Sequence, residues 1–296
     1  MPMGRPQAER VVDEALARRL LEDQHPDLAD LPLTHLDSGW DNVIYRLGDK
    51  LTVRLPRREV AAALLHHEQT WLPRIADGLP LPVPSPVAMG RPTAYYPWPW
   101  SVLPWFEGES ADLSPPRAEQ ADRFADFLIA LHRPAPADAP ANPVRGVPLM
   151  AREANTRERM GRLNSKSDAL SPALESIWES ALTAPQAGEA CWLHGDLHAQ
   201  NVLVNGTGSL TAIIDWGDIT RGDPATDLAG IWAVFPTRRA RQSILQAYRP
   251  DTALLDRARG WAFVFGVILT DSGNVNSPRH AAAGRRILER LEADSG

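Results

Sequence analysis

The segment 191–218 constrains this chain more than any other part of the sequence. Within it, Asp196 is followed after five residues by Asn201 and after nineteen by Asp215, and each of the three borders an apolar run. Two of these runs flank an Asn-Gly-Thr-Gly turn at 205–208, which is typical of a β-hairpin. Because a hairpin brings its two ends to one edge, the segment predicts a cluster of polar side chains beside a small β structure.

The three side chains have the chemistry needed to hold a divalent metal ion and a hydroxyl nucleophile over a nucleotide phosphate. The carboxylate of Asp196 is ionised at neutral pH and is suited to accept or orient a hydroxyl hydrogen. Asn201 and Asp215 offer one neutral and one charged oxygen to Mg²⁺, a hard ion that prefers oxygen ligands. We expect His194 to order the same loop by hydrogen bonding rather than to move protons.

Composition and charge exclude several classes of protein. A net charge of −6 does not provide the basic face of a nucleic-acid binder. Cys191 is the only cysteine, so no internal disulfide can form and a cytoplasmic location is expected. The longest apolar run, 261–269, is too short to span a bilayer. We therefore expect neither nucleic acid nor membrane as a partner.

The first hundred residues differ in pattern from the rest. Alternating apolar residues over 42–47 and 51–55 predict a β-hairpin, and helical spacing over 59–75 predicts a helix after it. The stretch 98–105, rich in Trp and Pro, indicates a stiff connector, because proline restricts the backbone and lacks an amide donor. The chain beyond it is mostly helical in pattern.

These patterns predict an α+β fold of two lobes with a nucleotide cleft between them. We place a β-rich nucleotide-binding lobe at 1–100 and a hinge at 101–106. The mainly helical lobe, 107–296, carries the catalytic loop, the metal site and the substrate-binding helices.

The motif His194-Gly195-Asp196, with Asn201 five residues later and Asp215 beyond it, resembles the signature of the aminoglycoside phosphotransferase family. Members of that family are small-molecule kinases with a protein-kinase-like fold. The resemblance covers about 38–229 and is most specific in its central motif. It implies a bilobal protein-kinase-like fold, a catalytic base at Asp196, metal ligands at Asn201 and Asp215, and Mg²⁺ with ATP or GTP as co-substrate.

Three further residues match the family pattern singly. Arg54 stands where the family places the basic residue that contacts the nucleotide phosphates, a position at which many members have arginine. Glu68, on the predicted helix, resembles the acidic residue that pairs with this basic group. Asp227 resembles the aspartate that follows the metal motif, and we expect it to brace the catalytic loop.

Two nucleotide contacts are less well marked in the sequence. There is no Gly-x-Gly-x-x-Gly, so Ser38 and Gly39 form the best candidate for a turn that covers the phosphates. The hinge should offer a backbone donor and acceptor to the base near Ser101, Val102 and Leu103. The sequence does not separate ATP from GTP.

The acceptor should bind on the helical lobe, and the resemblance implies carboxylates that meet a cationic substrate. The candidates are acidic residues of that lobe: Asp218, Asp271, Glu289 and Glu292. The lobe is not visibly an acidic basin, because it also carries many arginines, and its apolar helix near 261–269 could line a pocket for a less polar substrate such as a macrolide.

Several functions stay open at this point. The first is phosphorylation of a hydroxyl on an aminoglycoside-type or other antibiotic. The others are a metabolic kinase for a choline-, homoserine- or sugar-like acceptor, a non-catalytic nucleotide-binding protein, and a zinc hydrolase using His194, Asp196 and His198. We expect a small molecule and a nucleotide as partners, and either a monomer or a homodimer.

Overall fold

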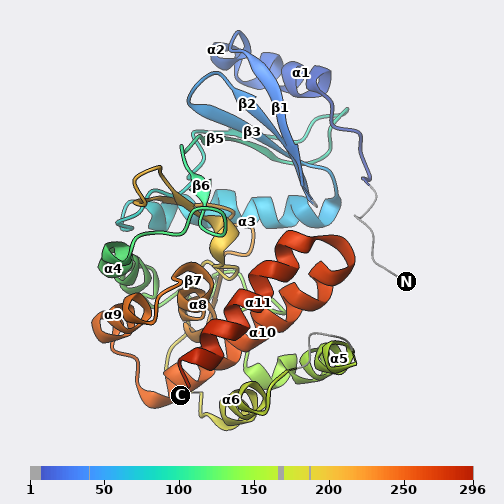
Figure 1. Ribbon diagram of the computed structural model, residues 1–296. Helices are drawn as coiled ribbons and strands as arrows, with labels where there is room; N and C mark the ends of the chain where they lie inside the picture. The colour runs from blue at the N-terminus through green and yellow to red at the C-terminus, as the bar shows by residue number, and fades with distance from the viewer. Residues whose placement is uncertain (1–7, 40, 166–169, 187, 296) are drawn as a thin grey trace.

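The structure, a computed structural model, describes residues 8–39, 41–165, 170–186 and 188–295. A twisted antiparallel sheet with three helices lies above a larger body that is mostly helical (Figure 1). Two separate hydrophobic cores correspond to this division, one around the sheet and one in the helical body.

The upper lobe is built on five strands in the spatial order β1-β2-β3-β5-β4, all pairing antiparallel. The predicted hairpin is present as β2 and β3, joined by a turn in which Gly48 has φ of +56°. The strands are β1 (Leu33–Ser38), β2 (Asn42–Leu47), β3 (Leu51–Pro56), β4 (Ala88–Gly90) and β5 (Trp100–Pro104).

Helices cover the sheet of the upper lobe. The first two, α1 (Glu14–Gln24) and α2 (Pro26–Ala29), lie at its outer end, and α3 (Glu59–Ala76) lies between the sheet and the lower lobe (Figure 1). Residues of α3 reach both cores: Ala62 belongs to the core of the sheet, whereas Trp71, Leu72 and Ile75 belong to the core of the helical body. The helix therefore ties the two lobes together.

The Trp- and Pro-rich stretch corrects one prediction. Instead of a stiff connector between two bodies, 100–104 is the strand β5, which pairs with β3 on one side and with β4 on the other. Trp100 and Val102 are fully buried in the core of the upper lobe. The proline at the end of the strand does not interrupt pairing, since a proline is tolerated where no ladder donor is needed.

The lower lobe is assembled from helices around the long helix α10, which packs along α11 and against α5, α6 and α7. In the described part of the chain, no helix is long and apolar enough to cross a membrane. The α-helices are α4 (Ala121–Leu131), α5 (Glu153–Asn164), α6 (Pro172–Thr183), α7 (Ala225–Leu228), α8 (Gly230–Val234), α9 (Arg238–Tyr248), α10 (Thr252–Asn276) and α11 (Pro278–Ala293). Three short 3-10 helices are η1 (Ala118–Gln120), η2 (Leu149–Arg152) and η3 (Ala199–Asn201).

Two small sheets at the top of this lobe hold the polar motif. One consists of β7 (Cys191–Leu193) and β10 (Thr220–Gly222), and the other of β6 (Glu109–Ser110), β8 (Val202–Val204) and β9 (Leu210–Ile213). The predicted hairpin is β8 with β9, in which Val202 is opposite Ile213. The catalytic loop thus lies between β7 and β8, and Asp215 lies just beyond β9.

Candidate active site

The predicted catalytic loop, 194–201, is stabilised by hydrogen bonds from its backbone to a buried carboxylate. Asp227, on α7, is fully buried and accepts hydrogen bonds from the backbone amides of His194 at 2.6 Å and Gly195 at 2.9 Å. Gly195 has φ of +86°, and a Cβ there would lie 2.5 Å from the carbonyl oxygen of Asp218. The loop therefore needs both the carboxylate beneath it and a residue without a side chain.

His194 joins the loop to the segment before Asp215. Its Nδ1 accepts from the amide of Asp196 at 3.2 Å, so the proton lies on Nε2, which donates to the carbonyl of Ile214 at 2.9 Å. Both ring nitrogens are engaged in this way, which leaves His194 no free nitrogen for a zinc ion. In the described ranges, no three His, Cys, Asp or Glu side chains form a group that could hold a metal ion.

Asp196 has two basic neighbours at its carboxylate. Nη2 of Arg145 is 2.7 Å from Oδ1, and Nε2 of His198 is 3.3 Å from Oδ2. Burial alone would raise the pKa of the Asp196 carboxyl, but the positive charges of Arg145 and His198 outweigh it and hold the pKa well below its usual range. Asp196 is therefore a carboxylate at any physiological pH, able to accept a hydrogen bond from a hydroxyl.

The two predicted metal ligands lie on either side of the hairpin base. Nδ2 of Asn201 donates to the backbone carbonyl of Asp196 at 2.9 Å, and the carbonyl of Asn201 accepts from the amide of Ile214 at 2.8 Å. Asp215 has φ of +61°, a conformation uncommon for a residue with a side chain, and its side chain is 57% exposed. The side chain of Asp215 thus projects towards Arg54 of the upper lobe instead of packing against the lower lobe.

An ion-pair chain crosses from the upper lobe to Asp215. Nη1 of Arg54 is 2.7 Å from Glu68, which is fully buried on α3, and Nη2 is 3.2 Å from Oδ1 of Asp215. Burial disfavours the charged guanidinium, but the two carboxylates raise the pKa of Arg54 above its usual value. With its amide oxygen turned inward, Asn42 accepts from Nη2 and Nε of Arg54 at 3.2 Å each.

At the remaining positions predicted to contact the nucleotide, backbone groups are already hydrogen-bonded within the upper lobe. Ser101, Val102 and Leu103 lie inside β5, and the carbonyl of Val102 accepts from the amide of Val87 at 2.8 Å. Backbone groups of an inner strand are hydrogen-bonded to the neighbouring strands. The predicted backbone contacts to the nucleotide base therefore do not fit this position. Ser38 is the last residue of β1, and Gly39 follows it, where the amide of Gly39 donates to the carbonyl of Asn42 at 2.8 Å.

The acidic residues predicted to bind the acceptor lie in three different environments. Asp218 lies beside the loop and accepts from Nδ2 of Asn142 at 2.6 Å. Burial, followed by the charge of Asp196, raises the pKa of the Asp218 carboxyl above its usual value. Asp271 is 6% exposed and is bound by Arg159 at 2.9 Å and by Arg162 at 2.7 Å, so it is neutralised within the lobe.

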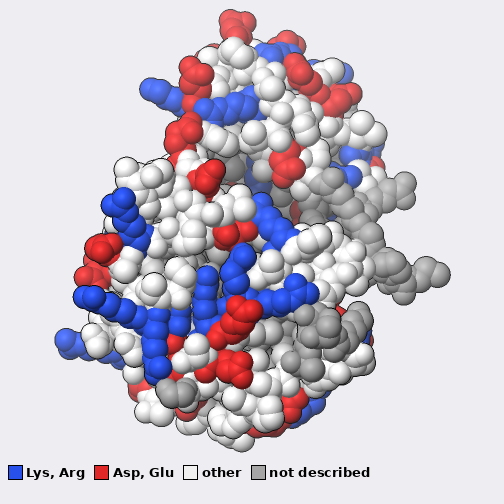
Figure 2. All heavy atoms as spheres, viewed as in Figure 1, with Lys and Arg blue, Asp and Glu red and all other residues white. Residues whose placement is uncertain are grey.

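Glu289 and Glu292 are exposed near the far end of α11. The beginning of this helix is the end close to the catalytic loop, because Nε2 of His280 is 3.1 Å from Oε1 of Gln200. The two glutamates follow His280 by nine and twelve residues, which is about 13 and 18 Å along a helix axis. Figure 2 shows Lys and Arg side chains on the face over α10 and α11, with Asp and Glu side chains interspersed between them.

Three residues near the motif were not predicted from the sequence: Arg145, Asn142 and Asn42. Arg145 and Asn142 belong to a Pro/Ala-rich loop without periodic pattern, more than fifty residues before Asp196, so no local signal marks them. Asn42 begins a predicted strand, and alternation puts it on the same face as Arg54, since Ile44 is the residue opposite Arg54. That register could have identified Asn42.

Comparisons with known proteins agree with this geometry. The sequence profile of the phosphotransferase enzyme family matches residues 32–261. A search of curated proteins finds no match.

Solved structures share the fold at low sequence identity. The GDP complex of aminoglycoside 2'-phosphotransferase-IIIa is 18% identical with a TM-score of 0.70, over 96% of this chain and 100% of that one. The gentamicin complex of APH(2")-IIa is 17% identical with a TM-score of 0.61, over 95% and 97%. The macrolide 2'-phosphotransferase MphH from Brachybacterium faecium is 21% identical with a TM-score of 0.61, over 92% and 97%. The bilobal kinase-like fold predicted from the sequence is thereby confirmed.

Proposed function

The chain belongs to the phosphotransferase enzyme family, and from this premise we propose that it transfers the γ-phosphoryl group of ATP or GTP to a hydroxyl of a small molecule. Mg²⁺ accompanies the nucleotide in this proposal. The observation that carries it is the convergence of Asp196, Asn201 and Asp215 at one edge of the cleft, with Arg54 reaching Asp215 from the other lobe at 3.2 Å.

Each residue has one role in the proposed reaction. The hydroxyl oxygen of the acceptor attacks the γ-phosphorus while its proton passes to the carboxylate of Asp196, and the nucleoside diphosphate leaves with the electron pair of the broken P–O bond. Arg54, oriented by Glu68 at 2.7 Å, binds the phosphates of the nucleotide. His198 donates its Nε2 proton towards Asp196 and keeps that carboxylate oriented.

Asn201 and Asp215 are suited to hold Mg²⁺. The ion takes oxygen ligands, needs few from the protein and accepts the rest from phosphate and water. One amide and one carboxylate that is 57% exposed meet this requirement. When bound, the ion neutralises charge that develops on the phosphate oxygens.

We propose that the purine lies against the chain just after β5 rather than at 101–103. The amide of Trp105 donates to the carbonyl of Lys50, towards β3, at 2.7 Å. Because successive backbone groups of a strand alternate in direction, the carbonyl of Pro104 and the amide of Phe106 face the opposite edge, beyond the last β4 pair at Ala88 and Val102. One acceptor and one donor there suit either purine.

The acceptor in this proposal is a small molecule that carries a hydroxyl group. Similar structures are complexes with kanamycin and gentamicin, and another is a macrolide 2'-phosphotransferase. An antibiotic hydroxyl is therefore one class of acceptor for this chain, and a hydroxylated metabolite is the other.

The test is release of ADP or GDP with Mg²⁺-ATP and Mg²⁺-GTP against aminoglycosides, macrolides, hydroxy acids and amino alcohols. Stimulated release that is lost in Asp196→Ala, while the nucleotide dissociation constant changes little, is the expected result. Asp215→Ala should weaken Mg²⁺-dependent nucleotide binding as well. Unchanged turnover in Asp196→Ala would refute the assignment of the base, and nucleotide binding without any transfer would favour a binding protein.

A further inference from the structure

Four arginines lie near one another in the helical lobe, and within the described residues only three of them have a counter-charge. Arg159 and Arg162, on α5, are both paired with Asp271 on α10. Arg145 is paired with Asp196 at 2.7 Å, and its guanidinium lies 5.0 Å from the centre of the Phe265 ring. The fourth, Arg152, lies at the end of η2 between these two groups.

Arg152 has no acidic partner in the part of the chain that the structure describes. Within the ranges that the structure describes, its side chain makes no hydrogen bond or ion pair, and its Nε is buried without an acceptor. Burial, and then the like charges of Arg145 and Arg159, lower the pKa of Arg152 below its usual value. A half-buried cation between two other cations is unfavourable unless an anion joins it.

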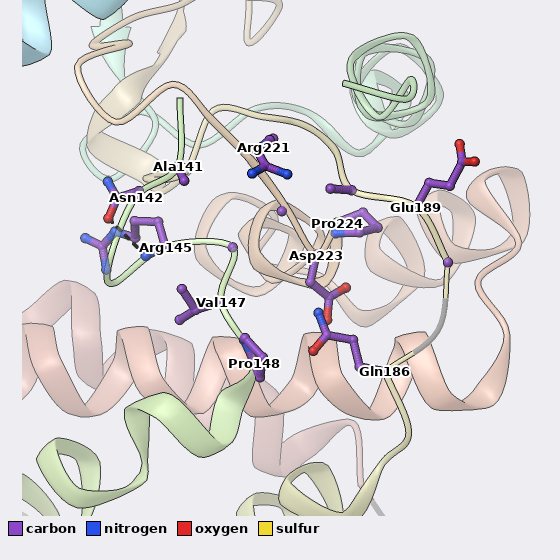
Figure 3. A pocket seen from close by; sticks show the side chains of 14 residues that line it. Ala141, Asn142, Arg145, Val147, Pro148, Gln186, Glu189, Arg221, Asp223 and Pro224 are labelled. Atoms are coloured by element: carbon purple, nitrogen blue, oxygen red, sulfur yellow. Dashed lines mark hydrogen bonds between the residues drawn. The ribbon is translucent and has the colours of Figure 1, made fainter. Parts of the chain in front are cut away.

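Arg145 has donors to spare as well. Its Nη2 is bound to Asp196, whereas its Nη1 has no acceptor among the described residues. Figure 3 shows the side chains of Arg145 and Asn142 directed away from the centre of the pocket that their backbone lines. These side chains therefore serve the catalytic side of the loop, where Asn142 meets Asp218 and Arg145 meets Asp196.

Among the described residues, the nearby carboxylates leave Arg152 unpaired. Asp271 is shared by Arg159 and Arg162, Arg162 also pairs with Glu158 at 2.6 Å, and Arg145 pairs with Asp196. An acceptor with several ammonium groups would meet uncompensated guanidinium groups here. An acceptor with a negative group would meet two cations that have donors available.

We infer that the acceptor carries an oxyanion, a carboxylate or a phosphate ester, which Arg145 and Arg152 bind beside Asp196. The inference rests on the proposed function and names its substrate class. Arg145 contacts both the base and the bound oxyanion, so an acceptor held in this way presents its hydroxyl to Asp196. The phosphoryl transfer itself proceeds as proposed above, with the hydroxyl proton passing to Asp196.

The direct test is anion binding to the protein loaded with Mg²⁺ and a non-hydrolysable ATP analogue, which occupies the nucleotide site. Sulfate and malonate are titrated at constant ionic strength against chloride, and the thermal midpoint is followed. We expect one of the two anions to raise the thermal midpoint of the wild type. A rise with tetrahedral sulfate indicates a phosphate-like acceptor, and a rise with malonate indicates a carboxylate acceptor. The rise should disappear in Arg152→Ala.

Arg157→Ala is the matched control. Arg157 lies on the same helical segment but is exposed and paired with Glu153 and Glu179, so its removal should leave the anion effect intact. No rise in the wild type, or an equal rise in the wild type and Arg152→Ala, would overturn the inference.

The kinetic test uses acceptor pairs that differ only in the anionic group, such as glycerate, glycerol 3-phosphate and glycerol, together with any acceptor identified by the panel. We expect Arg152→Ala to lower kcat/KM for the anionic acceptor about 10- to 100-fold, from the value of a charged hydrogen bond. The KM for the nucleotide should change by less than about twofold, whereas the loss of a charged hydrogen bond to the nucleotide would change it about tenfold. A substrate without any oxyanion, used equally by wild type and Arg152→Ala, would refute the inference and leave the phosphotransferase assignment intact.

Discussion

The contact between Asp227 and the catalytic loop leads to a quantitative prediction. The carboxylate accepts two buried backbone N–H bonds, at 2.6 and 2.9 Å, from His194 and Gly195. A hydrogen bond to a charged group contributes about 1.5–3 kcal/mol, so Asp227→Ala should lower the free energy of unfolding by about 3–6 kcal/mol. Asp227→Asn keeps one acceptor oxygen and should lose about half of that, roughly 1.5–3 kcal/mol.

The assay is urea unfolding followed by circular dichroism, together with acceptor-stimulated ADP release. With a slope of about 3 kcal/mol per molar urea, a loss of about 3 kcal/mol moves the midpoint by about 1 M. Asp126→Ala is the control, because Asp126 is exposed on α4 and a surface change there should stay within about 0.5 kcal/mol. An Asp227→Ala protein with the midpoint and turnover of the wild type would show that the loop does not depend on this carboxylate.

Three further predictions follow from the same site. Arg54→Ala should raise the KM of the nucleotide about tenfold or more by removing a charged phosphate contact; steady-state kinetics with varied ATP test this, and an unchanged KM would leave Arg54 a structural role only. Arg145→Ala removes a charge that depresses the pKa of Asp196, so the acid limb of the pH profile of kcat should move to higher pH. An unshifted limb would mean that Arg145 does not act on the base. Gly195→Ala should destabilise the protein by about 1–3 kcal/mol, because a φ of +86° is strained for alanine and its Cβ would meet the carbonyl of Asp218; thermal unfolding measures this, and a midpoint equal to that of wild type would contradict it.

The lowered pKa of Asp196 also determines the sign of one effect of pH on the stability of the fold. The pKa of Asp196 is lower in the folded protein than in the unfolded chain, so its ion pairs stabilise the fold above the unfolded value of the pKa. This contribution is lost as the pH falls towards the folded value. Arg145→Ala should therefore reduce the dependence of stability on pH in the acid range.

Local patterns were sufficient to predict the central motif. Asn201 and Asp215 are separated by a hairpin whose strands pair Val202 with Ile213, and a ladder between adjacent strands follows from alternation and a turn. The same reasoning predicted β2 and β3 and the helix α3. Each of these elements was predicted from a pattern of residues close together in the chain.

The stretch 100–104 shows where local reasoning fails. Tryptophan and proline indicated a connector, but the strand is completed by β3, about fifty residues earlier, and by β4. Whether a short apolar segment becomes an inner strand depends on which partners the rest of the sheet provides. No pattern within the segment carries that information.

By itself, then, the sequence determined the two-lobed fold class and indicated the residues proposed to bind a metal ion and to accept a hydroxyl proton, because these depend on residue chemistry and short-range pairing. Only the tertiary structure decided the charge around them. Asp271 became a partner of Arg159 and Arg162, more than a hundred residues away, and Arg145 was brought to Asp196 from a loop without pattern. Such pairings depend on how helices pack against one another, and the same packing left Arg152 without an acidic partner among the described residues.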